Sequence, residues 1–252
     1  MNRIDLFKQH LREKRAVKII AGIDNFDVEN IKKVITAANQ AGASAIDLCA
    51  SEEVLEVARQ MSKLPLFVSS IIPEELVQAV KMGADAIELG NFDALYKKGV
   101  RMEAQEVLEL AKLTASLIED SGVFFCVTVP GHISVSEQIN LARELEILGV
   151  DLIQTEGSSV IDAKSEGARG LIETAQVSIA NTIEIARNVD IPVMTASGIT
   201  TTTAALAFAA GASAIGVGSC INKLDSELAM MAVARNLVEI ASKNAQKEMV
   251  LA

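Results

Sequence analysis

Residues 191–220 read IPVMTASGITTTTAALAFAAGASAIGVGSC, and this segment decides the fold. Two short apolar stretches, Val193–Ala196 and Ser213–Val217, have the length and composition of buried strands, and both lead into a glycine beside a serine. The Ala-rich run between them predicts a helix that ends near Gly211. Strand, turn, helix, strand and turn in this order are typical of a parallel α/β sheet.

The same unit recurs along the 252 residues. The third and seventh strands share a proline start, Leu-Pro-Leu-Phe-Val from Leu64 and Ile-Pro-Val-Met-Thr from Ile191. Eight strand–helix units predict one (β/α)8 TIM barrel, a single domain over residues 1–252 in which residues 1–16 form a capping helix. Four helix-to-strand junctions follow the pattern Gly-x-x-x-Ile, beginning at Gly42, Gly83, Gly149 and Gly211.

Composition and charge exclude several classes of function. Half of the residues are apolar but only 3% are aromatic, so we expect an aliphatic core. The net charge of −10 argues against binding to nucleic acid and to an anionic membrane. No apolar run approaches the roughly 18 residues of a membrane span. The three cysteines are far apart, as expected for free thiols in a reducing compartment.

The two glycine turns have the chemistry of a phosphate site. Gly198 and Gly218 let the backbone approach a ligand closely, and Ser197 and Ser219 supply hydroxyl donors beside them. Both turns follow consecutive strands near the C-terminus, where TIM barrels commonly hold a phosphate. We therefore predict that these four residues and Gly157 bind a small phosphorylated ligand. The alternative is a pair of ordinary tight turns with nothing bound.

The repeat also predicts which side chains point into the barrel. The isoleucine of each Gly-x-x-x-Ile unit should face the helices, so the next residue faces the interior. Asp47, Glu88, Gln154 and Gly216 occupy these inward positions, and Glu156 lies two residues beyond Gln154. A buried carboxylate with a raised pKa is a suitable base for abstracting a proton next to a carbonyl. The catalytic candidates are therefore Glu88, then Glu156, then Asp47.

Other polar side chains are expected near the barrel mouth. His132, just after the fifth strand, is a further candidate acid or base. Asn91, Thr128 and Thr195 complete the mouth residues, and the alternative is that they join the carboxylates in a buried network without chemistry. Several cations are expected on loops near the mouth, where they either clamp an anion or are solvated surface charges. They are Lys97, Lys98, Arg101, Lys164, Arg169 and Lys223.

Missing residue types narrow the chemistry further. No lysine lies in the mouth half of any expected strand, and Lys18 falls near the start of the first, Val17–Ile23. Schiff-base chemistry, which needs an inward strand lysine, is therefore not expected. The chain has only two histidines, His10 and His132, and neither falls in an expected strand, so we expect no metal site.

Two segments carry a resemblance to a known family: PEELVQAVKMGADAIELGNFDALYKKG at Pro73–Gly99 and CVTVPGHISVSEQINLARELEILGVDLIQTEG at Cys126–Gly157. Over nearly its full length the chain resembles an uncharacterised family of cyanobacteria and algal plastids, a hypothetical chloroplast reading frame. The resemblance implies a cyanobacterial cytoplasm or a plastid stroma and no particular activity. The glycine turns are also similar to those of phosphate-binding barrels such as sugar-phosphate isomerases, thiazole synthase and flavin-dependent oxidases. Thiazole synthase uses a strand lysine that has no match here.

Three functions stay open from the sequence. The first is an isomerase, epimerase or lyase that moves a proton on a phosphorylated metabolite. The second is a protein that binds flavin mononucleotide (FMN) at the same phosphate site, against which the low aromatic content weighs. The third is a non-catalytic regulator that binds a phosphorylated ligand. The Ala- and Met-rich last two helices, with Phe208, Met230 and Met231, are compatible with a homodimer but mark no interface.

Overall fold

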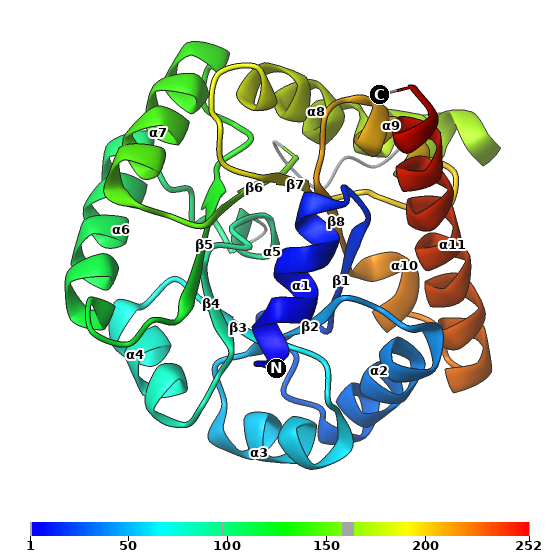
Figure 1. Ribbon diagram of the computed structural model, residues 1–252, viewed down its shortest axis with the longest axis horizontal. Coiled ribbons are helices and arrows are strands. Elements are labelled where there is room, and N and C mark those ends of the chain that lie inside the picture. The colour runs from blue at the N-terminus through cyan, green and yellow to red at the C-terminus, as the bar shows by residue number, and fades with distance from the viewer. Residues whose placement is uncertain (1, 97, 158–163, 252) are drawn as a thin grey trace.

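Eight parallel strands close into a barrel within residues 2–96, 98–157 and 164–251, which the computed structural model describes (Figure 1). Each strand pairs with its neighbours in chain order, and β1 pairs with β8 to complete the ring. The fold is therefore the TIM barrel that the repeat predicts. The strands are β1 (Ala16–Ile20), β2 (Ala45–Cys49), β3 (Leu66–Ser70), β4 (Ala86–Leu89), β5 (Phe124–Val129), β6 (Leu152–Thr155), β7 (Val193–Thr195) and β8 (Ala214–Val217).

Helices surround the barrel and pack one apolar face on the strands (Figure 1). Gly42 and Gly149 end their helices in the left-handed conformation that glycine adopts without strain, as the junction pattern predicts. Among the described helices, none is both long and apolar enough to cross a membrane. The helices are α1 (Arg3–Arg12), α2 (Val28–Ala41), α3 (Glu52–Met61), α4 (Pro73–Lys81), α5 (Asp93–Tyr96), α6 (Ala104–Ile118), α7 (Val135–Leu148), α8 (Gly167–Ala186), α9 (Ala204–Ala209), α10 (Ser219–Asn222) and α11 (Glu227–Leu251).

Helix α1 lies across the N-terminal end of the barrel and closes it, as the sequence predicts (Figure 1). The Phe7 ring meets Phe67 and Phe124 edge-on, with centroid distances of 5.0 and 5.8 Å. Such edge-to-face pairs add about 0.5–1.5 kcal/mol each beyond the burial of their area. This end of the barrel is therefore sealed by apolar packing, and only the C-terminal end is left to admit a ligand.

Three helices differ from the sequence expectation. The last barrel helix is expected over Asp225–Lys243, but α11 spans Glu227–Leu251. The pattern predicts the sixth barrel helix over Glu173–Asn188, but α8 begins at Gly167. The Glu173 carboxylate accepts hydrogen bonds from the backbone N–H groups of Lys164 and Ser165, both at 3.1 Å, and these local contacts tie the segment before α8 to its first turns. The short helix α10 was not expected, because four residues are too few for a periodic pattern. Residues 158–163 of the expected 157–170 loop lie outside the described residues.

Candidate functional site

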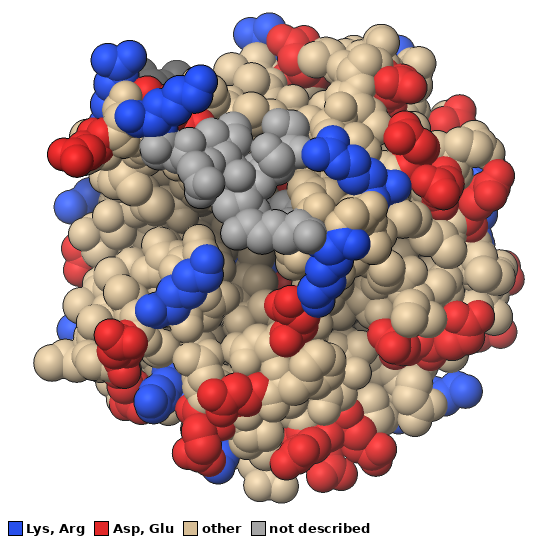
Figure 2. All heavy atoms as spheres, turned by 180° about the vertical axis from the view of Figure 1, so that it is seen from behind, with Lys and Arg blue, Asp and Glu red and all other residues tan. Residues whose placement is uncertain are grey.

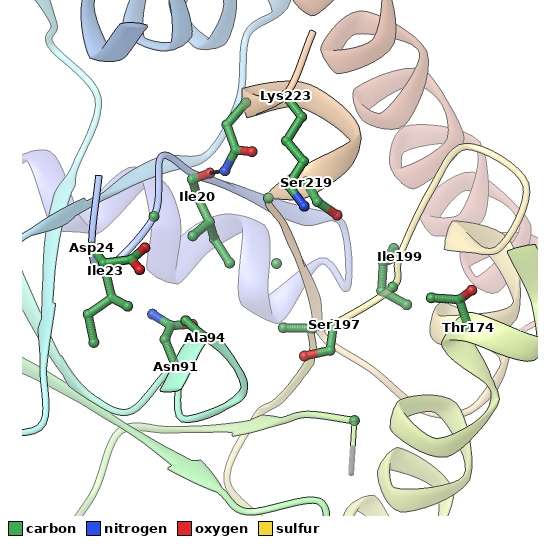
Figure 3. A pocket seen from close by; sticks show the side chains of 17 residues that line it. Ile20, Ile23, Asp24, Asn91, Ala94, Thr174, Ser197, Ile199, Ser219 and Lys223 are labelled. Carbon is green, nitrogen blue, oxygen red and sulfur yellow. Dashed lines mark hydrogen bonds between the residues drawn. The ribbon is translucent and has the colours of Figure 1, made fainter. Parts of the chain in front are cut away.

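A cleft of about 350 Å³ opens at the C-terminal ends of β7, β8 and β1 (Figure 3). It lies at the mouth, where TIM-barrel enzymes place their active sites. Four of the five residues predicted to bind phosphate, all but Gly157, come from the β7 and β8 turns, and all five line the cleft. The full lining is Ile20, Gly22, Ile23, Asp24, Asn91, Ala94, Gly157, Thr174, Ala196, Ser197, Gly198, Ile199, Gly216, Gly218, Ser219, Asn222 and Lys223.

The turn after β7 is held in an unusual backbone conformation. Ser197 has φ +68° and Gly198 has φ +74°, so two successive residues are left-handed. A Cβ atom on Gly198 would lie 2.7 Å from the carbonyl oxygen of Thr174, so α8 packs directly on the glycine. The Ser178 hydroxyl donates to the Ser197 carbonyl oxygen at 2.9 Å and ties α8 to the turn. Gly198 is therefore required by the fold itself.

The turn after β8 is different. Gly218 has φ −112° and ψ −88°, outside the left-handed region. A Cβ atom added here would meet nothing closer than 3.6 Å, the Asn222 side-chain nitrogen. Asn222 in turn donates to the carbonyl oxygens of Ile20 and Ala21, both at 3.1 Å, and fixes the turn against β1. Packing within the protein therefore leaves room for a side chain at Gly218.

Two non-glycine residues with positive φ line the cleft, Asn91 at +62° and Ser197 at +68°. Such conformations cost on the order of 1 kcal/mol or more each, and they concentrate at functional sites. Lys14 is the other such residue among those described, and it lies beyond the end of α1. Two of the three strained positions in the described chain thus face the same cleft.

The cleft has a positive side. Lys223 is exposed and extends beside Ser219 into the opening (Figure 3). Among the described residues, no carboxylate lies within ion-pair distance of Lys223, whereas Lys98 pairs with Asp24 at 3.2 Å. Figure 2 shows Lys and Arg side chains around the hollow at the mouth, while Asp and Glu side chains gather mainly toward the periphery. A strongly acidic chain thus presents cations where a ligand would enter.

Below the cleft lies a buried charge cluster. Lys18 donates to a Glu88 carboxylate oxygen and its Nζ is 3.6 Å from Asp47 Oδ2, and all three side chains are at most 1% exposed. Asp47 also accepts from the Ser69 hydroxyl at 2.5 Å and from Asn91 Nδ2 at 3.1 Å. Asn91 lines the cleft, so it connects the cluster to the ligand side.

Gln154 joins the same layer from β6. Its Nε2 donates to Glu88 Oε1 at 2.6 Å, to Asn91 Oδ1 at 3.0 Å and to Thr128 Oγ1 at 3.1 Å. The Thr128 hydroxyl donates in turn to Glu88 Oε1 at 3.0 Å. Asp47, Glu88 and Gln154 therefore meet inside the barrel beside Gly216, as the repeat predicts.

Burial and charge shift the pKa values of this cluster in known directions. Burial raises the pKa of Asp47 to about 6, against the lowering effect of the Lys18 charge. Burial by itself lowers the pKa of Lys18, but the Asp47 and Glu88 carboxylates outweigh it, and the net shift is upward. Lys18 is therefore a locked ammonium group and not a free amine, which disfavours Schiff-base chemistry.

The position of Lys18 corrects part of the sequence reasoning. It lies near the start of β1, as expected, but its side chain points inward and reaches the carboxylate layer. Alternation along β1 carries the signal, because Val17 and Ile19 belong to the core cluster shared with the helices. Lys18 between them must then face the interior.

The remaining predicted residues divide into two places. Near the mouth, the Tyr96 hydroxyl donates to Glu156 Oε1 and lies 3.2 Å from His132 Nδ1. Burial lowers the pKa of His132. Thr195 instead faces α8, where its hydroxyl lies 2.7 Å from that of Thr182, so the structure does not bring it to the mouth. Neither Glu156 nor His132 lines the cleft.

Sequence reasoning did not single out several cleft residues. Asn222 and Thr174 sit in helices without any marked pattern, and Ile20 and Ile23 read as ordinary strand residues. Asp24 follows the first strand, and the C-terminal position of such a residue was the available signal. Within the described residues, no group of three or more His, Cys, Asp or Glu side chains is arranged to hold a metal ion.

Solved structures with this fold are numerous, and their sequences differ widely from this one. Thiamine phosphate pyrophosphorylase from Pyrococcus furiosus aligns with a TM-score of 0.61 at 18% identity, covering 93% of this chain and 98% of its own. 3-Hexulose-6-phosphate synthase from Salmonella typhimurium aligns with a TM-score of 0.65 at 11% identity, covering 91% and 99%. At such identities the likeness establishes the TIM-barrel fold alone.

Sequence relatives are much closer. Uncharacterized protein ycf23 of Cyanophora paradoxa is 42% identical over 231 residues, 89% of this chain and 90% of the relative. Its counterpart in Pyropia yezoensis is 36% identical over 219 residues, 87% and 80% of the two chains. These matches confirm the resemblance to the plastid reading-frame family. Residues 1–247 match the family model described as protein of unknown function (DUF561), and the chain belongs to that family.

Proposed function

We propose that this barrel binds a small phosphorylated metabolite and holds the phosphate between the β7 and β8 turns, next to Lys223. Gly218 is the observation that carries the proposal. The fold has room for a side chain there, with no atom within 3.6 Å of an added Cβ, yet the position is glycine and borders the cleft. A glycine at a position where packing leaves room for a side chain is suited to a ligand that approaches the backbone closely.

The groups around Gly218 suit an anion. In the described chain, the backbone N–H groups of Gly198 and Ser219 have no hydrogen-bond acceptor, and both border the cleft. Lys223 adds a positive charge that no described carboxylate neutralises. Backbone N–H groups together with one cation form a common phosphate environment.

The names of the structural neighbours support the same ligand class. Thiamine phosphate pyrophosphorylase and 3-hexulose-6-phosphate synthase are barrels of this fold whose names contain a phosphorylated compound. The neighbours differ in chemistry, so they support a phosphate ligand more than any one reaction. The algal relatives support a plastid stroma, or the cytoplasm of a cyanobacterium, as the compartment.

For the reaction, we propose proton transfer by a buried carboxylate, as in an isomerase, epimerase or lyase. Asp47 is the best placed base, because burial raises its pKa to about 6 and Asn91 links it to the cleft at 3.1 Å. Neither carboxylate borders the cleft itself, and Glu88 has no contact with the lining residue Asn91, because its partners are Lys18, Thr128 and Gln154.

The test is calorimetric titration of the protein with inorganic phosphate, with phosphate esters and with FMN. We expect wild type to bind phosphate and Lys223→Ala to bind it about tenfold more weakly, a loss near 1.4 kcal/mol. Gly218→Ala should abolish binding without changing the melting temperature. Lys63→Ala is the matched control, because Lys63 is an exposed lysine ahead of β3, at the opposite end of the barrel.

Each outcome discriminates between functions. If wild type ignores phosphate, or Gly218→Ala binds as wild type does, the proposal is wrong. If purified wild type is yellow and Gly218→Ala is colourless, the phosphorylated ligand at this site is FMN. Loss of turnover in Asp47→Asn with ligand affinity kept would support proton transfer, and phosphate-ester binding without turnover in wild type would support the regulator.

A further inference from the structure

The Gln154 side chain holds an unused acceptor at the floor of the cleft. Gln154 is 1% exposed, and its Nε2 makes three hydrogen bonds inside the carboxylate layer. Its Oε1 is buried and receives no hydrogen bond from any described residue. Buried polar atoms nearly always have partners, so an orphaned one requires a physical explanation.

The orientation of this amide is fixed by its neighbours. Glu88 Oε1 is a carboxylate acceptor, and the Thr128 hydroxyl already donates its proton to that atom at 3.0 Å. The three atoms that face Nε2 are Glu88 Oε1, Thr128 Oγ1 and Asn91 Oδ1, and each of them acts as an acceptor there. Turning the amide over would point Oε1 at three acceptors, so the orphan is the oxygen and what it lacks is a donor.

Gly216 is what separates this oxygen from the cleft. A Cβ atom built on Gly216 would lie 3.1 Å from Gln154 Oε1, and also 3.1 Å from Ala196 Cβ and Ile20 Cδ1. Gly216, Ala196 and Ile20 all border the cleft. Gly216 therefore lies between the cleft and Oε1, and a methyl group at this position would crowd that oxygen.

Gly216 and Gly218 lie on the same face of the chain, because side chains alternate along a strand. Two residues of strand span about 6.6 Å. An extended covalent chain advances about 3.5 Å for every three bonds, so five bonds from a phosphorus atom cover on the order of 6 Å. A hydroxyl oxygen five bonds from the phosphorus, as in a three-carbon phosphate ester, therefore has the reach required.

We propose that Gln154 Oε1 accepts a hydrogen bond from a hydroxyl group of the ligand, so that the site takes a hydroxylated monophosphate such as a polyol or sugar phosphate. This rests on the proposed phosphate site. A second phosphate or a carboxylate does not fit the position, because its negative charge would face Gln154 Oε1 near the Asp47 and Glu88 carboxylates. The site therefore requires an uncharged hydrogen-bond donor at the inner end of the ligand.

The experiment compares three probes by calorimetric titration: inorganic phosphate, glycerol phosphate and propyl phosphate, which has the same carbon chain without hydroxyls. Wild type should bind glycerol phosphate about tenfold more tightly than propyl phosphate, the range of one hydrogen bond. Gln154→Met and Gly216→Ala should each lose this preference and still bind inorganic phosphate. Gln138→Met is the matched control, since Gln138 is a buried glutamine on α7 that donates to the Ile133 carbonyl oxygen at 3.0 Å.

The outcomes separate this inference from the proposed function. If wild type binds none of the probes, the phosphate site itself is wrong and this inference falls with it. If wild type binds phosphate but treats glycerol phosphate and propyl phosphate alike, only the hydroxyl contact is overturned, and an ordered water satisfies Oε1. Should Gln154→Met fail to fold, Gly216→Ala tests the same contact, and a preference kept in that variant would also overturn it.

Discussion

Replacing Lys18 by methionine tests whether the buried charge cluster is organised as the distances indicate. The ammonium contacts Glu88 and lies 3.6 Å from Asp47, and no part of the Lys18 side chain is exposed. Methionine fills a similar volume but leaves two carboxylates in a sealed interior. Removing one partner of a buried ion pair destabilises a protein by about 3–5 kcal/mol, a large part of the 5–15 kcal/mol typical of a domain.

The loss should depend on pH with a defined sign. Burial and the nearby Glu88 carboxylate raise the pKa of Asp47, and the Lys18 charge opposes them, so in folded Lys18→Met the pKa of Asp47 rises further above its value in the unfolded chain. A raised carboxyl pKa stabilises the fold at low pH, and that contribution is lost as the pH rises through the folded value. The deficit of Lys18→Met against wild type should therefore be smaller at pH 5 than at pH 8.

The assay is urea denaturation at both pH values, read as the free energy of unfolding. Lys18→Met/Glu88→Gln, which removes the ammonium together with the nearer of its two carboxylates, should recover part of the lost stability. Lys32→Met, at an exposed pair 2.7 Å from Glu29, is the matched control and should cost less than about 1 kcal/mol. A Lys18→Met deficit below about 1 kcal/mol, or a double variant no better than the single one, would refute the reasoning.

Three further predictions concern the rest of the barrel. Phe7→Ala should lower the free energy of unfolding by about 3–5 kcal/mol in urea melts, because it empties the aromatic seal under the barrel; a loss under about 1 kcal/mol would mean that α1 does not seal that end. Gly198→Ala should lower the melting temperature measured by calorimetry, because the new Cβ would lie 2.7 Å from the Thr174 carbonyl oxygen. Gly218→Ala should leave the melting temperature unchanged, and equal effects of the two variants would contradict the different packing of the two turns. Burial lowers the pKa of His10 to about 4, with Arg15 as a second cause, so wild type should lose stability as the pH falls from 6.5 to 4; the same pH profile in His10→Gln would show that another group titrates.

The inward layer of the barrel could be predicted because the sequence marks it. Each even strand begins with Gly-x-x-x-Ile, and the isoleucines Ile46, Ile87, Ile153 and Ile215 all lie in the cluster shared with the helices. Once the isoleucines are known to face the helices, the alternation of side chains along each strand places Asp47, Glu88 and Gln154 inside the barrel without any tertiary information. The prediction succeeded where a repeated residue fixed the register of a strand.

The odd strands carry no such marker, and the reasoning was weaker there. Thr195 was expected at the mouth, but Val193 and Thr195 face the helices while Met194 faces the interior. Threonine is accepted on either face of a strand, so composition could not decide. The contact of Lys18 with the carboxylates was missed for a related reason. Its position along the strand was considered, but the side of the strand on which its side chain lies was not.

The polar layer itself requires an explanation that stability does not supply. Apolar residues of similar volume often replace a buried ion pair with no loss of stability, so the TIM barrel does not need Lys18, Glu88 and Asp47 to fold. Gln154 also requires an explanation, because its Oε1 stays unsatisfied among the described residues while the neighbouring Gly216 borders the cleft. A purely structural network would satisfy that oxygen or exchange the glutamine for an apolar residue. A network that fixes one amide and leaves its acceptor beside a glycine of the cleft instead supports the proposal that the donor comes from outside the chain.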